Sequence, residues 1–219
     1  MEDISGFCTA VQEKVGENIK VIFDIGSRDA LESIEFSRRF PNAKIYAFEA
    51  NPTSYQKCLD NIRGLDRIVV TNKVINDFDG FCKFYPINTE KTITAHADGN
   101  PGASSIFLSN GAADHVEKYV QDEIKLPCTR LDTFCKENNI TGVDAIWMDL
   151  QGAELLALTS LGILLDTVKV IETELEINPM YTGQCLFEET NKFLVDKGFR
   201  LISGDLTVHF GTNVVYIRD

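Results

Sequence analysis

Two acidic residues stand at the ends of two apolar runs near the start of the chain. Residues 21–23 lead into Asp24 and Gly26, and residues 45–48 lead into Glu49. Short apolar runs that end at a glycine turn are typical of buried strands. Open parallel sheets bind ligands at the carboxyl ends of their strands, where an acid roughly 20 positions after the glycine binds ribose hydroxyls. The spacing predicts a nucleoside site with Glu49 on the sugar; a solvated strand-end carboxylate is the competing interpretation.

A third acidic residue, Asp149, follows the apolar run 145–148 and precedes Gly152. We expect it at the centre of the same sheet edge, where it could orient the amino group of a cofactor or the acceptor of a reaction. Asp149 is also well placed to cap the following helix. Glu154, in the first turn of that helix, has the simpler role of interacting with the helix dipole.

The glycine content of the first turn separates two classes of nucleotide ligand. A nicotinamide dinucleotide needs several glycines so that the backbone can approach its pyrophosphate. This turn has only Gly26. S-adenosylmethionine carries no phosphate, and one tight turn is enough to hold it. The residues therefore favour S-adenosylmethionine over NAD, with Asp24, Gly26 and Glu49 acting together.

Three further polar residues are candidates for contacts with this cofactor. Arg28 could bind its methionine carboxylate or form an ion pair with a neighbouring aspartate, Asp24 or Asp29. Asn76 and Asp77 end the next predicted strand, where they could contact the adenine amino group. Asp77 also opens a turn that ends in glycine, so a role in the turn alone is the competing interpretation.

Methyl transfer to a hydroxyl group requires a proton acceptor in addition to the methyl donor. His96 is the candidate, because it lies in a long loop and imidazole has an ordinary pKa of about 6.5. A surface position without a catalytic role is the competing interpretation. His115 and His209 are weaker candidates.

Acidic residues near the end of a later strand could hold a metal ion. Glu172, Glu174 and Glu176, together with Asp149, offer the carboxylate oxygens that Mg²⁺ prefers. Their spacing matches no known ligand pattern, and a solvated rim explains most of them. We therefore assign no metal site.

The elements that would position these residues alternate between strands and helices. Apolar periodicity and capping signals, such as Pro52 directly after Asn51, mark most of the boundaries. The predicted helices cover residues 3–18, 29–40, 52–64, 131–138, 153–161 and 186–197. The predicted strands cover residues 20–25, 44–49, 67–75, 81–87, 122–129, 145–150, 168–174, 199–203 and 208–217.

This order predicts a single α/β domain over residues 1–219 with a mostly parallel sheet. We expect the strand 81–87 to pair back on its predecessor as a hairpin, and the loop 88–110 to be a lid or binding loop. The last two strands are too close in sequence for a crossover, so they form an antiparallel pair. The expected parts are an N-terminal helix at 1–18, a cofactor-binding half at 20–77, an inserted hairpin and lid loop at 78–128, and the rest of the sheet at 129–219.

The composition disfavours several classes of protein. A net charge of −12 disfavours binding to nucleic acid or to an anionic membrane surface. The six cysteines are scattered without a C-x-x-C motif, which indicates reduced thiols of a cytoplasmic protein. The acidic start of the chain lacks the apolar region of a secretory signal, and no apolar run approaches the ~18 residues of a membrane span.

Three blocks of the sequence resemble the FkbM family of methyltransferases. They are Phe-Asp-Ile-Gly-Ser-Arg-Asp at 23–29, Ala-Phe-Glu-Ala-Asn-Pro at 47–52 and Met-Asp-Leu-Gln-Gly-Ala-Glu-Leu at 148–155. The third block corresponds to the Asp-x-Glu/Gln-Gly-Ala-Glu signature of the family, and the likeness runs from about residue 20 to residue 217. Ser27 and Arg28 replace the Ala-Asn common in the family, and Ala30 replaces its next glycine.

The resemblance implies a Rossmann-like class I methyltransferase fold, whose seven-stranded sheet has an antiparallel last strand. It adds Ser27, Ala50 and Ser105 to the expected cofactor contacts, Ser105 through a serine-containing segment that faces the cofactor in the family. It also implies transfer of a methyl group from S-adenosylmethionine to a hydroxyl of a sugar, glycan or secondary metabolite. A non-catalytic member that binds the cofactor or a partner is one alternative, and a nicotinamide-dependent oxidoreductase is another.

Overall fold

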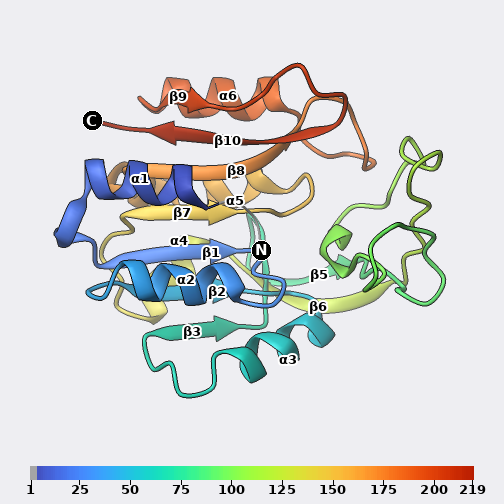
Figure 1. Ribbon diagram of the computed structural model, residues 1–219, viewed down its shortest axis with the longest axis horizontal. Helices are drawn as coiled ribbons and strands as arrows, with labels where there is room; N and C mark the ends of the chain where they lie inside the picture. The colour runs from blue at the N-terminus through green and yellow to red at the C-terminus, as the bar shows by residue number, and fades with distance from the viewer. Residues whose placement is uncertain (1–3) are drawn as a thin grey trace.

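A seven-stranded sheet runs through the centre of the molecule (Figure 1). The computed structural model describes residues 4–219 and places these strands at β1 (Val21–Ile25), β2 (Lys44–Phe48), β3 (Ile68–Thr71), β7 (Ala145–Met148), β8 (Val170–Glu176), β9 (Arg200–Ser203) and β10 (Gly211–Ile217). Their order is β3-β2-β1-β7-β8-β10-β9. The first five are mutually parallel, and β10 runs antiparallel to both of its neighbours. The predicted sheet, with its antiparallel last strand, is confirmed.

Helices cover both faces of this sheet (Figure 1). One face carries α1 (Ser5–Lys14) and α2 (Leu31–Arg39), while the other carries α4 (Leu131–Glu137), α5 (Glu154–Ser160) and α6 (Phe187–Asp196). The remaining α-helix of the described residues, α3 (Pro52–Asn61), lies against β3. All six helices begin and end close to the predicted boundaries, except that residue 3 of the first one lies outside the described residues.

Aromatic side chains fill the core on both faces of the sheet. On the first face, Phe7 and Phe36 pack against Trp147 with ring centroids 5.5 and 5.7 Å apart. On the second face, Phe48 packs against Phe134 at 4.8 Å. Each such pair contributes about 0.5–1.5 kcal/mol beyond the burial of its area. Strands covered on both faces are apolar throughout, so the polar residues at their tips are held at the edge of a rigid core.

The sequence predicts the start of α3 but not its buried face. The side chain of Asn51 accepts a hydrogen bond of 3.0 Å from the backbone N–H of Thr53, as expected of an N-cap before Pro52. The fully buried residues of the helix are Ser54 and Cys58. The larger apolar residues expected there are only half-buried, because the helix lies at the edge of the sheet; they are Tyr55, Leu59 and Ile62.

A second, three-stranded sheet corrects the prediction for the strands 67–75 and 81–87. The predicted strand 67–75 is divided into two strands. β3 stays in the main sheet, and β4 (Val74–Ile75) joins the second sheet. The predicted hairpin is wrong. β5 (Gly80–Phe84) pairs antiparallel with β6 (Ile124–Thr129), and β6 lies between β4 and β5.

The break between β3 and β4 has a local cause. The side-chain amide of Asn72 donates hydrogen bonds of 2.8 and 2.9 Å to the carbonyl oxygens of Glu49 and Ala50. These carbonyl groups follow directly after β2, so the chain turns away from the main sheet at Asn72. Val74 and Ile75 then pair with β6 in the second sheet.

The long segment between β5 and β6, residues 85–123, lies over the carboxyl ends of the central strands (Figure 1). Isolated bridges join Tyr85 to Ser105, Ile87 to Gln121 and Ile93 to Lys118, so this inserted segment folds back on itself. Its only helical piece is a 3₁₀ turn at Pro101–Ala103. The predicted loop at 88–110 is therefore confirmed as irregular structure.

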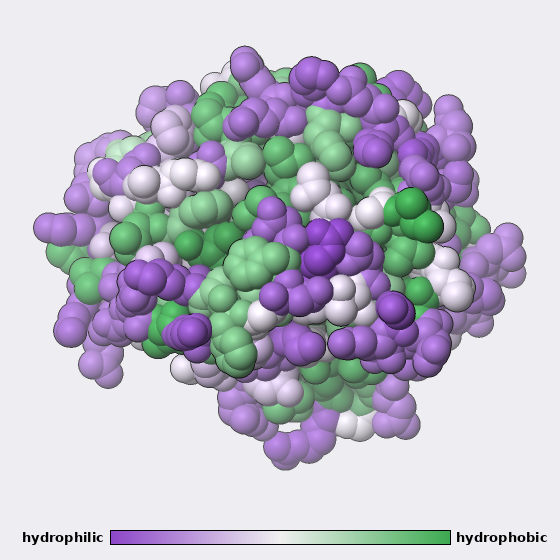
Figure 2. Space-filling view, turned by 180° about the vertical axis from the view of Figure 1, so that it is seen from behind, coloured by the Kyte–Doolittle hydropathy of each residue, from purple (hydrophilic) through white to green (hydrophobic). Residues whose placement is uncertain are grey.

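The face of the molecule opposite the view of Figure 1 has a largely hydrophilic outline with apolar atoms nearer its centre (Figure 2). Within residues 4–219, no helix has both the length and the apolar composition that crossing a membrane requires.

Candidate functional site

A cavity of about 440 Å³ opens where the carboxyl ends of the central strands meet the inserted segment. Cavities of 300–1,000 Å³ are typical of sites for small molecules. Nine of the predicted site residues line it: Asp24, Gly26, Ser27, Arg28, Glu49, Ala50, His96, Ser105 and Asp149. The structure therefore brings together residues that lie more than 100 positions apart in the sequence.

The turn after β1 is built around Gly26. Its N–H and that of Ser27 donate to the carbonyl oxygen of Phe48 at 2.9 and 3.0 Å, which joins the tips of β1 and β2. The φ of Gly26 is +90°, and a Cβ placed there would lie 1.8 Å from the backbone oxygen of Asp149. Ala30 keeps the left-handed conformation, with φ of 63°, at the position where the family has its next glycine. Alanine therefore occupies a left-handed conformation that glycine adopts more readily.

Glu49 is buried at the tip of β2, with 8% of its surface exposed. Its two carboxylate oxygens each accept a hydrogen bond of 2.7 Å, one from the N–H of Arg28 and one from the N–H of Asn51. Burial raises the pKa of Glu49 to about 8, with smaller contributions from Asp24 and Asp149. A carboxyl group with its position fixed in this way, at the wall of the cavity, can accept further hydrogen bonds from a ligand.

Asp24 and Arg28 have different surroundings from those that the sequence suggested. Asp24 is buried and accepts hydrogen bonds from the hydroxyls of Ser27 and Ser33. Burial raises its pKa to about 7. Arg28 pairs with neither nearby aspartate; its guanidinium lies 2.6 Å from a carboxylate oxygen of Asp98 in the inserted segment. Arg28 therefore joins the β1 turn to the inserted segment across the cavity.

Gln151 connects the tips of β7 and β8. Its side-chain nitrogen donates to Asp149 at 2.8 Å and to Glu174 at 3.0 Å, and its side-chain oxygen accepts from the hydroxyl of Tyr181 at 2.7 Å. Burial raises the pKa of Asp149. The predicted cap role of Asp149 is not seen, since no side chain caps α5. Asp149 instead belongs to a hydrogen-bonded group at the wall of the cavity.

Two further acids lie behind this group. Glu154 is buried and accepts from the backbone N–H groups of Leu150 and Gly152 at 2.8 and 3.3 Å, which fixes the loop after β7. Burial raises the pKa of Glu154 to about 7. Burial and the neighbouring carboxylates raise the pKa of Glu176 to about 9. At neutral pH the rear wall of the cavity therefore carries less negative charge than its count of acids implies.

His96 lies on the inserted segment and lines the cavity, with 52% of its side chain exposed. Its Nε2 atom is 3.4 Å from a carboxylate oxygen of Glu117. Glu117 also accepts hydrogen bonds from the hydroxyls of Thr94 and Tyr119. The structure thus gives His96 an acidic partner and access to the cavity.

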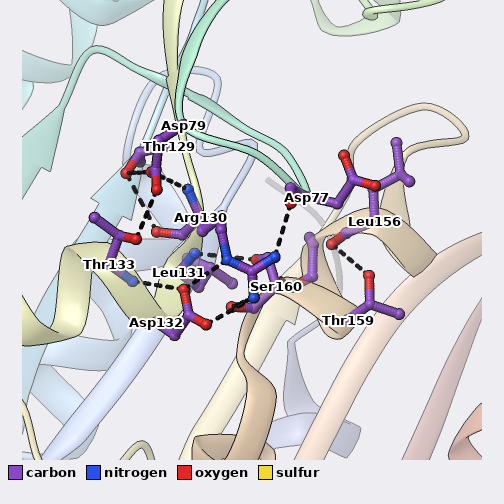
Figure 3. Close-up of polar contacts among 11 residues, drawn as sticks. Asp77, Asp79, Thr129, Arg130, Leu131, Asp132, Thr133, Leu156, Thr159 and Ser160 are labelled. Carbon is purple, nitrogen blue, oxygen red and sulfur yellow. Dashed lines mark hydrogen bonds and ion pairs between the residues drawn. The ribbon is translucent and has the colours of Figure 1, made fainter.

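Asn76 and Asp77 do not line the cavity, and Lys73, Val74 and Ile75 do so instead. The side chain of Asn76 is buried and accepts from the N–H of Asp77. The backbone oxygen of Asp77 accepts a hydrogen bond of 2.7 Å from Arg130, as Figure 3 shows. The two residues expected to contact the adenine thus lie outside the lining of the cavity, and the three residues before them take that place.

The inserted segment is tied down at several points. The hydroxyl of Ser105 donates to the backbone oxygen of Gln151 at 2.9 Å, and the hydroxyl of Tyr181 lies 2.9 Å from the backbone oxygen of Ala103. Sequence reasoning missed Glu117, Tyr119 and Tyr181 at the site. No local pattern distinguishes them. Glu117 and Tyr119 lie in the inserted segment and Tyr181 lies between β8 and α6, so only the folded chain brings them to the site.

Carboxyl groups outnumber basic groups in the lining of the cavity, and a positively charged ligand would favour their ionised form. Eight carboxyl groups line the cavity, against one lysine and one arginine: Asp24, Asp29, Glu32, Glu49, Glu117, Asp149, Glu174 and Glu176. Among the residues that the structure describes, no three His, Cys, Asp or Glu side chains come together in an arrangement that could hold a metal ion. The same part of the chain contains all six cysteines as free thiols.

The buried acids predict how stability depends on pH in the absence of ligand. The pKa values of about 7, 8, 7 and 9 for Asp24, Glu49, Glu154 and Glu176 lie above those of unfolded carboxyl groups. Between the unfolded and the folded pKa values the folded state therefore holds more protons than the unfolded state, and the free energy of unfolding falls as pH rises. We expect stability to fall as pH rises from about 5 to 9.

Urea unfolding at several pH values measures this dependence. Below about pH 4 the trend reverses, because ion pairs and hydrogen bonds lower the pKa of other carboxyl groups, such as Asp98 and Asp132, and their contribution is lost on protonation. The variant Glu176→Gln should show a smaller loss between neutral and alkaline pH. Stability that rises from pH 5 to pH 8 would show that the buried acids are ionised in the folded protein.

Comparison with known proteins identifies the family. The methyltransferase FkbM domain matches residues 15–201. The 2-O-methyltransferase NoeI of Sinorhizobium fredii is 30% identical over 171 residues; the match covers 75% of this chain and 66% of NoeI, just under two thirds of that protein.

Solved structures agree on the fold alone. An rRNA methylase from Streptococcus thermophilus superposes with a TM-score of 0.51 at 10% identity, over 100% of this chain and 97% of that one. The fibrillarin pre-rRNA processing protein of Methanococcus jannaschii does so with a TM-score of 0.53 at 12% identity, over 91% and 66%. With the sheet order, the cavity and the domain match together, this chain belongs to the FkbM methyltransferase family.

Proposed function

We propose that this chain transfers the methyl group of S-adenosylmethionine to a hydroxyl group of a sugar, glycan or secondary metabolite. The observation that carries the proposal is the position of Glu49, buried at the β2 tip beside the Gly26 turn and exposed to the cavity on one side. An acid there is suited to hold the ribose of a nucleoside. The name of NoeI, a 2-O-methyltransferase, supports a hydroxyl acceptor.

The residues of the cavity fit this cofactor. Glu49 would accept hydrogen bonds from the ribose, the Gly26 turn would leave room for the chain that links it to sulfur, and the acidic wall would favour a sulfonium cation. When bound, S-adenosylmethionine supplies an activated methyl group, so the protein contributes mainly position. Arg28 pairs with Asp98 and Ser105 donates to the backbone of Gln151, and these two contacts hold the inserted segment over the site.

The alternatives receive less support from the geometry. A nicotinamide dinucleotide would have to place its pyrophosphate at a turn with a single glycine, beside the carboxyl groups of Glu49 and Asp149. A non-catalytic member would bind the cofactor equally well but would transfer nothing. That possibility is decided by experiment, since the same residues form the cavity in both cases.

Incubation with S-adenosylmethionine carrying a radiolabelled methyl group tests the proposal. The protein is given a panel of monosaccharides, disaccharides and alditols. We then measure the radiolabel that is incorporated into each compound as an acid-stable methyl ether. Label should appear on at least one of these hydroxyl compounds, and calorimetry should show micromolar binding of S-adenosylhomocysteine. Binding without transfer to any compound of the panel would favour the non-catalytic alternative, and absence of binding would contradict the cofactor assignment.

A further inference from the structure

The two ends of the cavity lie at different strands. Glu49 follows β2 and Gly26 lies at the end of β1, whereas Glu174 lies on β8 and Gly211 begins β10. Neighbouring strands are about 4.8 Å apart, so the four steps from β2 to β10 span roughly 19 Å. If Glu49 holds the nucleoside, as proposed above, the end between β7 and β10 is left for the acceptor.

Glu174 is a carboxyl group with a fixed position at this far end. The register of β7 and β8 pairs Met148 with Thr173, which places Glu174 beside Asp149. Glu174 is half-buried and lines the cavity. The single side-chain nitrogen of Gln151 donates to both acids, at 2.8 Å to Asp149 and 3.0 Å to Glu174. One amide thereby holds two carboxyl groups at the tips of adjacent strands.

Two more residues set the position of Glu174. The hydroxyl of Tyr181, 2.7 Å from the side-chain oxygen of Gln151, directs the amide nitrogen of Gln151 toward the acids. Gly211 does not have a left-handed φ, yet a Cβ there would lie only 3.0 Å from an oxygen of Glu174. Glycine at this position therefore serves to leave room for the carboxyl group rather than to permit an unusual backbone conformation.

We propose that Glu174 binds the acceptor hydroxyl and takes its proton during methyl transfer. This inference rests on the function proposed above and names the group that performs its acid–base step. As the hydroxyl oxygen bonds to the methyl carbon, the hydroxyl proton passes to a carboxylate oxygen of Glu174, and the electron pair of the breaking carbon–sulfur bond stays on sulfur. The protonated Glu174 then returns its proton to water.

The position of Glu174 makes it a better proton acceptor than His96. Glu174 is held by contacts within the rigid edge of the sheet, whereas His96 is half-exposed on the inserted segment. The titratable groups around Glu174 come from four places: Asp149 after β7, Glu176 on β8, Tyr119 on the inserted segment and Tyr181 before α6. A correctly placed general base accelerates a reaction by about 10²–10⁴-fold.

Replacement of the carboxyl group by an amide tests the proposal. Glu174→Gln preserves size, and Glu188→Gln, at an exposed position of α6, is the matched control. With an acceptor from the panel above, kcat of Glu174→Gln should fall by about 100-fold or more, while affinity for S-adenosylhomocysteine stays within about threefold of the wild type. His96→Asn should lose far less of its kcat than Glu174→Gln does.

A binding measurement gives a readout that needs no turnover. In protein labelled with ¹³C at glutamate carboxyl carbons, the Glu174 resonance is the one absent from Glu174→Gln. With S-adenosylhomocysteine bound, addition of the acceptor should shift that resonance. If Glu174→Gln does not fold, Gly211→Ala moves the same carboxyl group, and should lower kcat by about tenfold without changing affinity for S-adenosylhomocysteine.

The outcomes that overturn this inference differ from those that overturn the function. Unchanged kcat in Glu174→Gln, or a Glu174 resonance that the acceptor leaves in place, would overturn the assignment alone. Loss of transfer in His96→Asn with full transfer in Glu174→Gln would make His96 the base. A wild-type protein that binds no S-adenosylhomocysteine, or transfers to no hydroxyl compound, would overturn both.

Discussion

Gly26→Ala is expected to lower the free energy of unfolding by about 4 kcal/mol or more, or to prevent folding altogether. A Cβ at this position would lie 1.8 Å from the backbone oxygen of Asp149 and 2.9 Å from its carbonyl carbon. Both atoms belong to the backbone of Asp149, whose N–H donates to the carbonyl oxygen of Ile25 at 2.9 Å, so no side-chain rotation can relieve the overlap. The φ of +90° adds conformational strain for any other residue. Urea unfolding of the purified variant measures the effect.

Gly6→Ala is the matched control for this substitution. Gly6 lies in the first turn of α1, and a Cβ there would meet no atom within 4 Å. Alanine is a better helix former than glycine, so this variant should be as stable as the wild type or more stable by about 0.5–1 kcal/mol. A Gly26→Ala variant with wild-type stability would show that the β1 and β7 tips are farther apart than the structure has them.

The residues at the strand tips could be predicted because their signals are local. Asp24, Gly26, Glu49 and Asp149 each follow a short apolar run, and the parallel order of those strands places all the tips at one edge. No long-range information was needed beyond the alternation of strands and helices. His96, expected in the long loop because of its weak patterning, lies in the irregular inserted segment and lines the cavity.

The rest of the site depends on pairings that local sequence does not specify. The stretch 67–75 is rich in valine and isoleucine, which predicts one strand, whereas the side chain of Asn72 bonds to the end of β2 at the point where the stretch divides. β5 pairs with β6, some 40 residues later in the chain. In the second sheet β6 lies between β4 and β5, where direct pairing of β5 with β4 was expected. Tyr181 and Gly211 were missed for the same reason, since they act through Gln151 and Glu174 on other elements.

Glu49→Ala is expected to weaken binding of S-adenosylmethionine and S-adenosylhomocysteine by about 100-fold or more, as measured by calorimetry. A hydrogen bond to a charged group contributes about 1.5–3 kcal/mol, and a carboxylate that holds both ribose hydroxyls makes two of them. Glu188→Ala, which removes an exposed carboxylate that does not line the cavity, should bind as the wild type does. Unchanged affinity in Glu49→Ala would remove the ribose assignment.

A loss of affinity in Glu49→Ala has a second possible origin, which a thermodynamic cycle separates. Glu49 also accepts the N–H groups of Arg28 and Asn51, so its truncation could disturb the turn without any contact to the ribose. We therefore compare S-adenosylhomocysteine with its 2′-deoxy analogue on both proteins. If Glu49 holds the 2′-hydroxyl, removal of either partner costs affinity and removal of both costs little more. If the two losses add, Glu49 acts on the cofactor through the backbone of the turn alone.

Proton release gives an independent measure of the same contact. The pKa of Glu49 is about 8 in the ligand-free protein, because the carboxyl group is buried near other acids. A bound sulfonium cation and two hydroxyl donors both favour the carboxylate, so they lower this pKa and a proton must leave as the cofactor binds near neutral pH. Calorimetry of the wild type in buffers of different ionisation enthalpy should detect this proton, and S-adenosylhomocysteine, which lacks the cation, should release less. The Glu49→Gln variant has no ionisable proton at this position. It should therefore release fewer protons than the wild type does when S-adenosylmethionine binds.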